Sequence, residues 1–278
     1  MISSTDNNVL VLHSRLYGEG REIVQFLSES RGKFAGVRRL SKRSGFQRLQ
    51  PFTLGHVRVS GRSSLLTVSS FEYVKKYDLI GRRLSVGFYV LELIQKLFVE
   101  GEPDPEIYHS TIKALDSLSA SDELERCLRL FEIELLASLG YEVDFGYEGA
   151  SGTQISESDY YQFAPDQGFY KIKPSSERGI LGKDLLSVNI GMENLNGSNL
   201  KLLKVINRKI IDSLLSGREL TSRKLIIKQK TWLRSPGNKY EFSLEDRSPP
   251  VISLPTKVHG KPMIPCEVST VTFLRMII

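Results

Sequence analysis

The chain has 278 residues, of which 40% are hydrophobic and 25% charged, typical of a globular protein long enough for one large domain or a few small ones. Its two cysteines, Cys127 and Cys266, lie far apart in the sequence, which excludes a disulfide framework and a cysteine-rich zinc site. There is no signal-peptide pattern and no run of 18 apolar residues, so we expect a cytoplasmic protein without membrane segments.

Charge is unevenly distributed along the chain. The formal net charge is +6, but residues 1–80 hold 13 basic and 6 acidic side chains, residues 81–160 hold 6 and 16, and residues 161–240 hold 15 and 6. Alternating charge blocks favour separate modules that contact separate partners.

The first module is predicted to be all β. Short apolar or alternating stretches, separated by glycine-containing turns, predict five strands at residues 9–14, 22–27, 33–40, 54–60 and 65–73. Five short strands in about 70 residues indicate a small closed barrel, and the OB-fold is the commonest such barrel that binds nucleic acid.

Helices are predicted to follow. Apolar spacing and stop signals predict helices at 82–99 and 106–118, a third that begins after Ser119 or Ser121 and stops at Gly140, and a fourth at 198–215. The core side of the fourth is assigned to Leu202, Val205, Ile206, Ile210 and Leu214. Between the third and fourth helices, a β-hairpin is predicted at 160–163 and 169–172.

These elements predict an α+β fold: an N-terminal five-stranded OB-fold barrel, then an α-helical bundle with a small inserted β-hairpin subdomain. We expect an OB-fold domain at 1–80, a helical domain at 81–234 with an irregular insert at about 146–197, and a loosely ordered, proline-rich tail at 235–278.

Residues 30–71 contain no acidic residue, a pattern that favours a surface for polyphosphate if its cations share one face. Phe34 and Phe52 are expected in the barrel core, whereas Phe46 lies in a predicted loop and is a better platform for base stacking. A solvated basic face is the alternative interpretation. The predicted DNA-binding residues of this stretch are Arg31, Lys33, Arg38, Arg39, Lys42, Arg43, Phe46, Arg48, Arg58 and Arg62.

A second basic surface is predicted on the fourth helix and the segment after it, although a solvated face is equally consistent with the pattern. Its predicted DNA contacts are Lys201, Lys204, Arg208, Arg223 and Lys224.

No catalytic motif is present in the sequence. The four histidines are isolated, no phosphate-binding GxxxxGK[ST] loop exists, and the acidic residues at 100–106 surround a proline-rich helix break typical of a solvated turn. We therefore expect neither an enzyme nor a bound metal or cofactor. An RNA-binding OB-fold protein of translation or ribosome assembly remains an alternative, and a nuclease with a degenerate motif a weaker one.

Four ordered stretches resemble the bacterial recombination-repair family RecO. They are VLHSR at 11–15, LQPFTL at 49–54, LFEIELL at 130–136 with LGYEVDF at 139–145, and GRELTSRKL at 217–225. The resemblance covers about residues 8–232.

The resemblance implies binding to single- and double-stranded DNA, annealing of complementary strands, and work with RecR to place RecA on gaps covered by single-strand-binding protein. It also implies a pocket for the acidic tail of that protein, and Arg126 and Arg129 are the predicted tail-binding residues unless they pair with Glu132 or Glu134. Some RecO proteins carry a four-cysteine zinc site in the insert, but residues 146–197 here contain no cysteine.

Overall fold

The computed structural model describes residues 3–40, 47–173, 179–189 and 195–226. Three of the predicted DNA-binding residues, Lys42, Arg43 and Phe46, lie outside these ranges, as does the predicted tail at 235–278.

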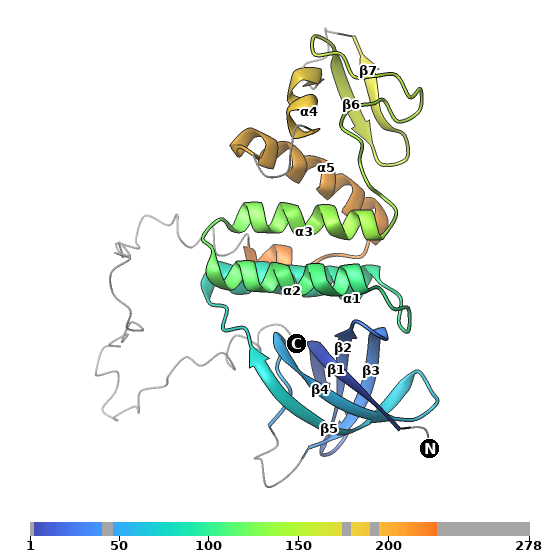
Figure 1. Cartoon of the computed structure of the whole chain (residues 1–278), viewed down its shortest axis with the longest axis vertical. Helices are drawn as coiled ribbons and strands as arrows, with labels where there is room; N and C mark the ends of the chain where they lie inside the picture. The colour runs from blue at the N-terminus through green and yellow to red at the C-terminus, as the bar shows by residue number, and fades with distance from the viewer. Residues whose placement is uncertain (1–2, 41–46, 174–178, 190–194, 227–278) are drawn as a thin grey trace, which may run out of the picture. The chain divides into compact units, whose positions relative to one another are not determined.

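Five N-terminal strands form a closed barrel, as predicted (Figure 1). They are β1 (Ser3–Leu16), β2 (Arg21–Ser28), β3 (Gly32–Arg39), β4 (Thr53–Ser60) and β5 (Leu65–Lys76). The strand order around the barrel is β1-β2-β3-β5-β4; β3 and β5 are parallel, and the other neighbours are antiparallel.

The barrel interior is filled by alternate side chains from all five strands, because successive residues of a strand point to opposite faces. On β4, Val57 and Val59 point inward and are almost fully buried, whereas Arg58 between them is exposed. Phe34 is buried against Phe26, with ring centroids 5.2 Å apart. Phe34 is thus in the barrel core, as predicted, whereas Phe52 is buried in the core under the helices, with its ring centroid 4.9 Å from that of Phe88.

The upper end of the barrel is joined to the helices by buried polar contacts. Lys33 is only 7% exposed, and its Nζ donates a 2.6 Å hydrogen bond to the carbonyl oxygen of Gln95 on α1 (Gly81–Leu97). The amide of Gln95 in turn donates to the carbonyl oxygen of Leu12 on β1. Gly32, beside Lys33, has φ +67°, and a Cβ there would collide with the backbone of Glu102. Barrel and helices therefore share one tightly packed junction.

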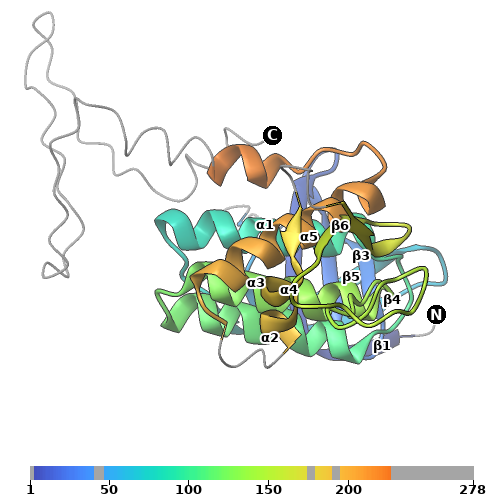
Figure 2. The same ribbon diagram turned by 90° about the horizontal axis from the view of Figure 1, so that it is seen from above.

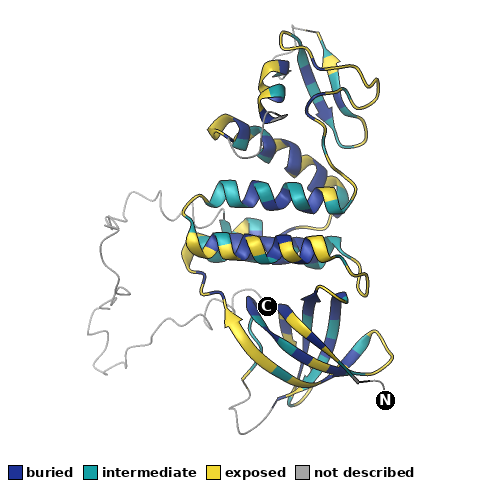
Figure 3. Cartoon of the chain, in the orientation of Figure 1, coloured by how far each residue is buried: buried dark blue, intermediate teal, exposed yellow. Residues whose placement is uncertain are grey.

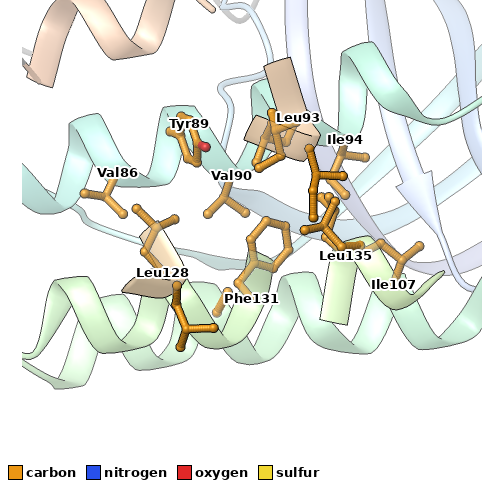
Figure 4. Packing of buried hydrophobic residues seen from close by; sticks show 14 of the residues in the cluster. Val86, Tyr89, Val90, Leu93, Ile94, Ile107, Leu128, Phe131 and Leu135 are labelled. Carbon is orange, nitrogen blue, oxygen red and sulfur yellow. The ribbon is translucent and has the colours of Figure 1, made fainter. Parts of the chain in front are cut away.

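The helical part is built on α1, α2 (Pro105–Ala120), α3 (Leu124–Ser138) and α5 (Gly197–Leu215). Figures 1 and 2 both show α2 running alongside α3. Figure 4 shows apolar side chains of α1, such as Val90 and Ile94, facing Phe131 and Leu135 of α3. Figure 3 shows this inner side as buried and the C-terminal part of β5 as exposed. No helix within the described ranges is long and apolar enough to cross a membrane.

The insert holds a small sheet with an aromatic core. Strands β6 (Tyr160–Ala164) and β7 (Gly168–Ile172) form the predicted hairpin. The sequence pattern missed two further elements of the insert: the short strand β8 (Ile180–Leu181), which pairs with β6, and helix α4 (Gly182–Asn189). Phe169 is 1% exposed, and its ring centroid lies 5.1 Å from that of Phe163 and 5.4 Å from that of Phe145. Aromatic packing thus stabilises this subdomain.

Replacement of Phe169 by alanine is expected to destabilise the chain by about 3–5 kcal/mol, because it opens a cavity among three packed rings. Chemical denaturation measures the loss. Lys171→Ala, two residues further along β7, is the control. Its side chain is exposed and, within the described ranges, forms an ion pair only with Asp159, so the substitution should change the free energy of unfolding by less than about 1 kcal/mol. Equal effects of the two substitutions would contradict an aromatic core.

Candidate nucleic-acid interface

Three exposed arginines gather on the outer face of β1, β2 and β3. Arg21 on β2 is the direct cross-strand partner of Arg39 on β3, and Arg15 on β1 pairs with Ile23, two residues along β2. All three arginines are exposed, and none forms an ion pair with a residue of the described ranges. Like charges directly opposite each other destabilise a sheet. We call this surface, with His13 beside Arg15, the β1–β2–β3 face.

Electrostatics on this face disfavour further positive charge. Partial burial, followed by the guanidinium groups of Arg48 and Arg15, lowers the pKa of His13. The positive charges of Arg48 and Arg15 thus add to the effect of burial in disfavouring protonation of the His13 imidazole.

The remaining cations of the acid-free stretch do not share one surface. Arg58 lies on the outer side of β4, opposite Thr5 of β1 and Ser70 of β5, and so on a different face. Arg62 lies in the loop at 61–64, directly before Leu65, which pairs with Ala35 of β3. Arg62 is exposed in this loop, and Arg58 lies outside the β1–β2–β3 face.

Two other arginines of the stretch are bound to carboxylates of the barrel. Arg38 forms a 2.7 Å ion pair with Glu22, whose side chain is fully buried and also accepts a hydrogen bond from the backbone of Leu49. Arg31 pairs with Asp6 at 3.0 Å. Both acidic partners lie outside the acid-free stretch, which is why the sequence pattern did not reveal them.

Arg48 and Lys33 are likewise engaged inside the fold. Arg48 donates a 2.5 Å hydrogen bond to the carbonyl oxygen of Ser14, and Lys33 is buried at the junction with α1. The prediction that Lys33 lies on the basic surface is wrong, because its ammonium group binds a helix carbonyl instead of projecting into solvent.

The second predicted basic surface is largely neutralised by carboxylates. Lys204 pairs with Glu125 at 2.9 Å, Arg208 with Asp212 at 3.6 Å, Arg223 also with Asp212, and Lys224 with Glu219. Lys201 is exposed and has no ion-pair partner within the described ranges.

A cleft of about 160 Å³ lies between α1, α3, α5 and the helical residues 221–226. Its apolar lining comes from Val86, Leu124, Leu128 and Ile226, and its cationic lining from Arg82, Arg129, Lys204, Arg208 and Arg223. We call it the helical cleft.

Beneath the helical cleft lies a buried polar network centred on Glu132. Arg129, 3% exposed, pairs with Glu132 at 2.9 Å, and Tyr89 and Asn207 donate hydrogen bonds to the same carboxylate. Burial raises the pKa of Glu132, while Arg129 acts in the opposite direction. The Nε of Arg129 and one terminal nitrogen of Arg223 are buried without a hydrogen-bond partner in the described ranges.

The structure separates the two predicted tail-binding arginines. Arg129 lines the helical cleft, whereas Arg126 lines a different cavity, between α2 and α3 beside Cys127, and lies 3.9 Å from Glu123. Arg129 pairs with Glu132, which is the alternative to tail binding that the sequence pattern left open for this residue. Arg82 was not predicted as a site residue, and Arg223 was assigned to DNA instead; their place beside Arg129 was not predictable because both lie far from α3 in sequence.

Comparison with known proteins gives a consistent family assignment. The model for the N-terminal part of recombination protein O matches residues 1–77, and the model for its C-terminal part matches residues 81–217. "DNA repair protein RecO" of Idiomarina loihiensis is 33% identical over 226 residues, covering 78% of this chain and 95% of that protein. The chain belongs to the RecO family. The protein of the same name from Vibrio parahaemolyticus is 31% identical over 223 residues, covering 78% and 90%.

Both candidate surfaces fall within the RecO match. The β1–β2–β3 face lies in the N-terminal RecO part, and most of the helical cleft lies in the C-terminal part, with Arg223 and Ile226 just beyond residue 217. The RecO chain described here thus carries its exposed barrel cations and its cationic cleft on separate parts of the fold.

Adjacent arginines of β3 are expected to differ in their effect on stability. Arg38→Ala leaves the carboxylate of Glu22 buried without its ion-pair partner and should cost about 2–3 kcal/mol, less than for a fully buried pair because Arg38 is partly exposed. Arg39→Ala removes an exposed side chain and should change stability by less than about 0.5 kcal/mol. Urea denaturation measures the free energy of unfolding of both variants. Equal losses of stability would contradict a structural role for Arg38 and a free, exposed side chain for Arg39.

Proposed function

We propose that this RecO-family chain is a DNA repair protein that binds single- and double-stranded DNA without reading its sequence and anneals complementary strands. It acts as a binding protein, not as an enzyme, and works in the cytoplasm at the bacterial nucleoid. The observation that carries the proposal is the pair Arg21 and Arg39, which lie opposite each other, without an ion-pair partner in the described ranges, on the face with which OB-folds bind oligonucleotides.

The mechanism is electrostatic. A phosphate backbone along the β1–β2–β3 face relieves the repulsion between Arg21 and Arg39, and the release of condensed counterions drives binding whatever the sequence. Arg58, on another face of the same barrel, offers a contact to a second strand. Annealing then follows because cations on one small barrel reduce the repulsion between two backbones.

The DNA affinity should fall as the salt concentration rises, with a slope set by a small number of phosphate contacts. If Arg15, Arg21, Arg39 and Arg62 each contact one phosphate of a single strand, log K should fall with log salt at a slope near −3, about −0.7 per contact. Arg39→Ala should weaken binding to all sequences alike and reduce the slope by about 0.7. Fluorescence anisotropy with a labelled oligonucleotide measures both.

Ser213→Ala is the control for Arg39→Ala, because Ser213 is exposed on α5, outside the barrel, and carries no charge. A salt-independent affinity, or a loss confined to one DNA sequence, would contradict the mechanism. Running complementary DNA and RNA in the same annealing assay, with single-strand-binding protein present, tests the RNA-binding alternative, which requires faster annealing of RNA.

The partners we propose are RecR, the tail of single-strand-binding protein and, indirectly, RecA. The helical cleft supports a place for the tail, because an acidic peptide with an apolar end needs both features of this cleft. Leu128 and Val86 offer an apolar wall, and the exposed guanidinium group of Arg82 offers donors for a carboxylate.

Arg82 at the rim of the helical cleft provides a test of this site. Arg82→Ala should weaken binding of an acidic tail peptide roughly threefold, as expected for one exposed ion pair worth less than about 1 kcal/mol. Titration calorimetry at low salt measures the change. Arg126→Ala removes a cation of the neighbouring cavity and should leave the affinity unchanged; the reverse pattern would place the tail between α2 and α3.

A further inference from the structure

A cavity of about 280 Å³ lies on the β1–β2–β3 face, among the candidate phosphate contacts. Its walls come from three neighbouring strands: His13 and Arg15 on β1, Gln25 on β2 and Ala35 on β3. The register fixes this grouping, because Gln25 is the cross-strand partner of both His13 and Ala35. Its volume is close to the lower limit of small-molecule pockets, so it suits a ligand of one ring system.

The floor of the cavity is apolar and its rim is polar. Ile23, Ala35 and Leu65 supply the floor, and Leu65 is the cross-strand partner of Ala35 on β5. The small side chain of Ala35 lies in the middle of this sheet surface, and a longer apolar side chain there would fill the space. A planar apolar ring is the chemical group that such a floor accommodates.

The rim offers both donors and acceptors. Gln25 supplies an amide, His13 an imidazole and Glu100, from the turn after α1, a carboxylate. None of these three side chains makes a hydrogen bond to another residue of the described ranges. The carboxylate of Glu100 disfavours a phosphate inside the cavity but accepts hydrogen bonds from amino groups. The lining of the cavity therefore suits a nucleobase better than the phosphate backbone of a nucleic acid.

We propose that this cavity receives one unpaired nucleobase of single-stranded nucleic acid, while the arginines around it hold the adjacent phosphates. The inference rests on the proposed function and adds to it a preference for single strands. A base stacked and paired in a duplex cannot enter a pocket in the protein surface, whereas a base of a single strand turns outward freely. Arg15 lines the cavity and belongs to the β1–β2–β3 face, so it connects the base contact with the phosphate contacts.

The test compares two labelled oligonucleotides of equal length and charge with the full chain. One carries bases throughout, and the other carries abasic sites throughout, so that only the backbone remains. The wild-type chain should bind the base-containing strand about tenfold more tightly, a difference of roughly 1.4 kcal/mol. Ala35→Leu, which fills the cavity, should reduce that ratio to near one and leave binding of the abasic strand unchanged.

Gln25→Leu is a second variant for the same site, in case the larger residue at position 35 disturbs the barrel. Ala137→Leu makes the matched substitution at an exposed position of α3 and should leave the ratio at tenfold. A wild-type ratio near one, or a tenfold ratio that survives both cavity variants, would overturn the base pocket while leaving DNA binding intact. Failure of the wild-type chain to bind either strand would instead overturn the proposed function.

Discussion

The register of β2 against β3 decides which arginines of the barrel are structural and which remain for a ligand. It places Glu22 opposite Arg38 and Arg21 opposite Arg39, and successive residues of a strand point to opposite faces. The inward pair is a buried ion pair, whereas the outward pair brings two like charges together. A shift by one residue would exchange these roles and bury an unpaired arginine.

The packing of the barrel supports this register. Val24 and Phe26 of β2 point into the barrel core, so Arg21, Ile23 and Gln25 must point out. At the other end of the same face, Leu10 and Leu27 are covered by the helices and belong to the helical core. One outer face thus changes along its length from a packed junction to an open cationic surface, and the cavity lined by Gln25 lies between the two.

Much of the fold was predictable from local sequence pattern. Strand alternation, turn glycines and helix stop signals located all five barrel strands, three of the four long helices to within a few residues and the hairpin of β6 and β7. Helix α3 was predicted to start somewhat earlier than Leu124. Val205, assigned to the core side of α5, is 52% exposed, whereas Leu203 and Ile211 are buried, because the contacts of α5 with α3 and α4 select a slightly rotated face. Short elements such as β8 and α4 lack enough periodicity to be recognised.

The candidate site was predictable only in outline. A count of charges locates a basic segment, but ion pairs between residues distant in sequence decide which of its cations remain free to bind a ligand. Arg31, for example, forms an ion pair with Asp6. Arg15 and Arg21 were missed because they lie outside the acid-free stretch and have acidic neighbours in sequence, of which Glu22 is buried in the barrel and pairs with Arg38. Only the strand register, which sequence pattern did not supply, brings Arg15, Arg21 and Arg39 onto one face.

The most direct test of the central claim is to map where a single strand touches the barrel. Photocrosslinking of a 4-thiothymidine oligonucleotide, followed by peptide mass spectrometry, identifies the contacted residues in the full chain. The account predicts crosslinks in peptides of β1, β2 and β3 that contain His13, Arg21 or Arg39, and their loss in the double variant Arg21→Ala, Arg39→Ala. Crosslinks confined to α5 and the residues after it, unchanged in that variant, would contradict it.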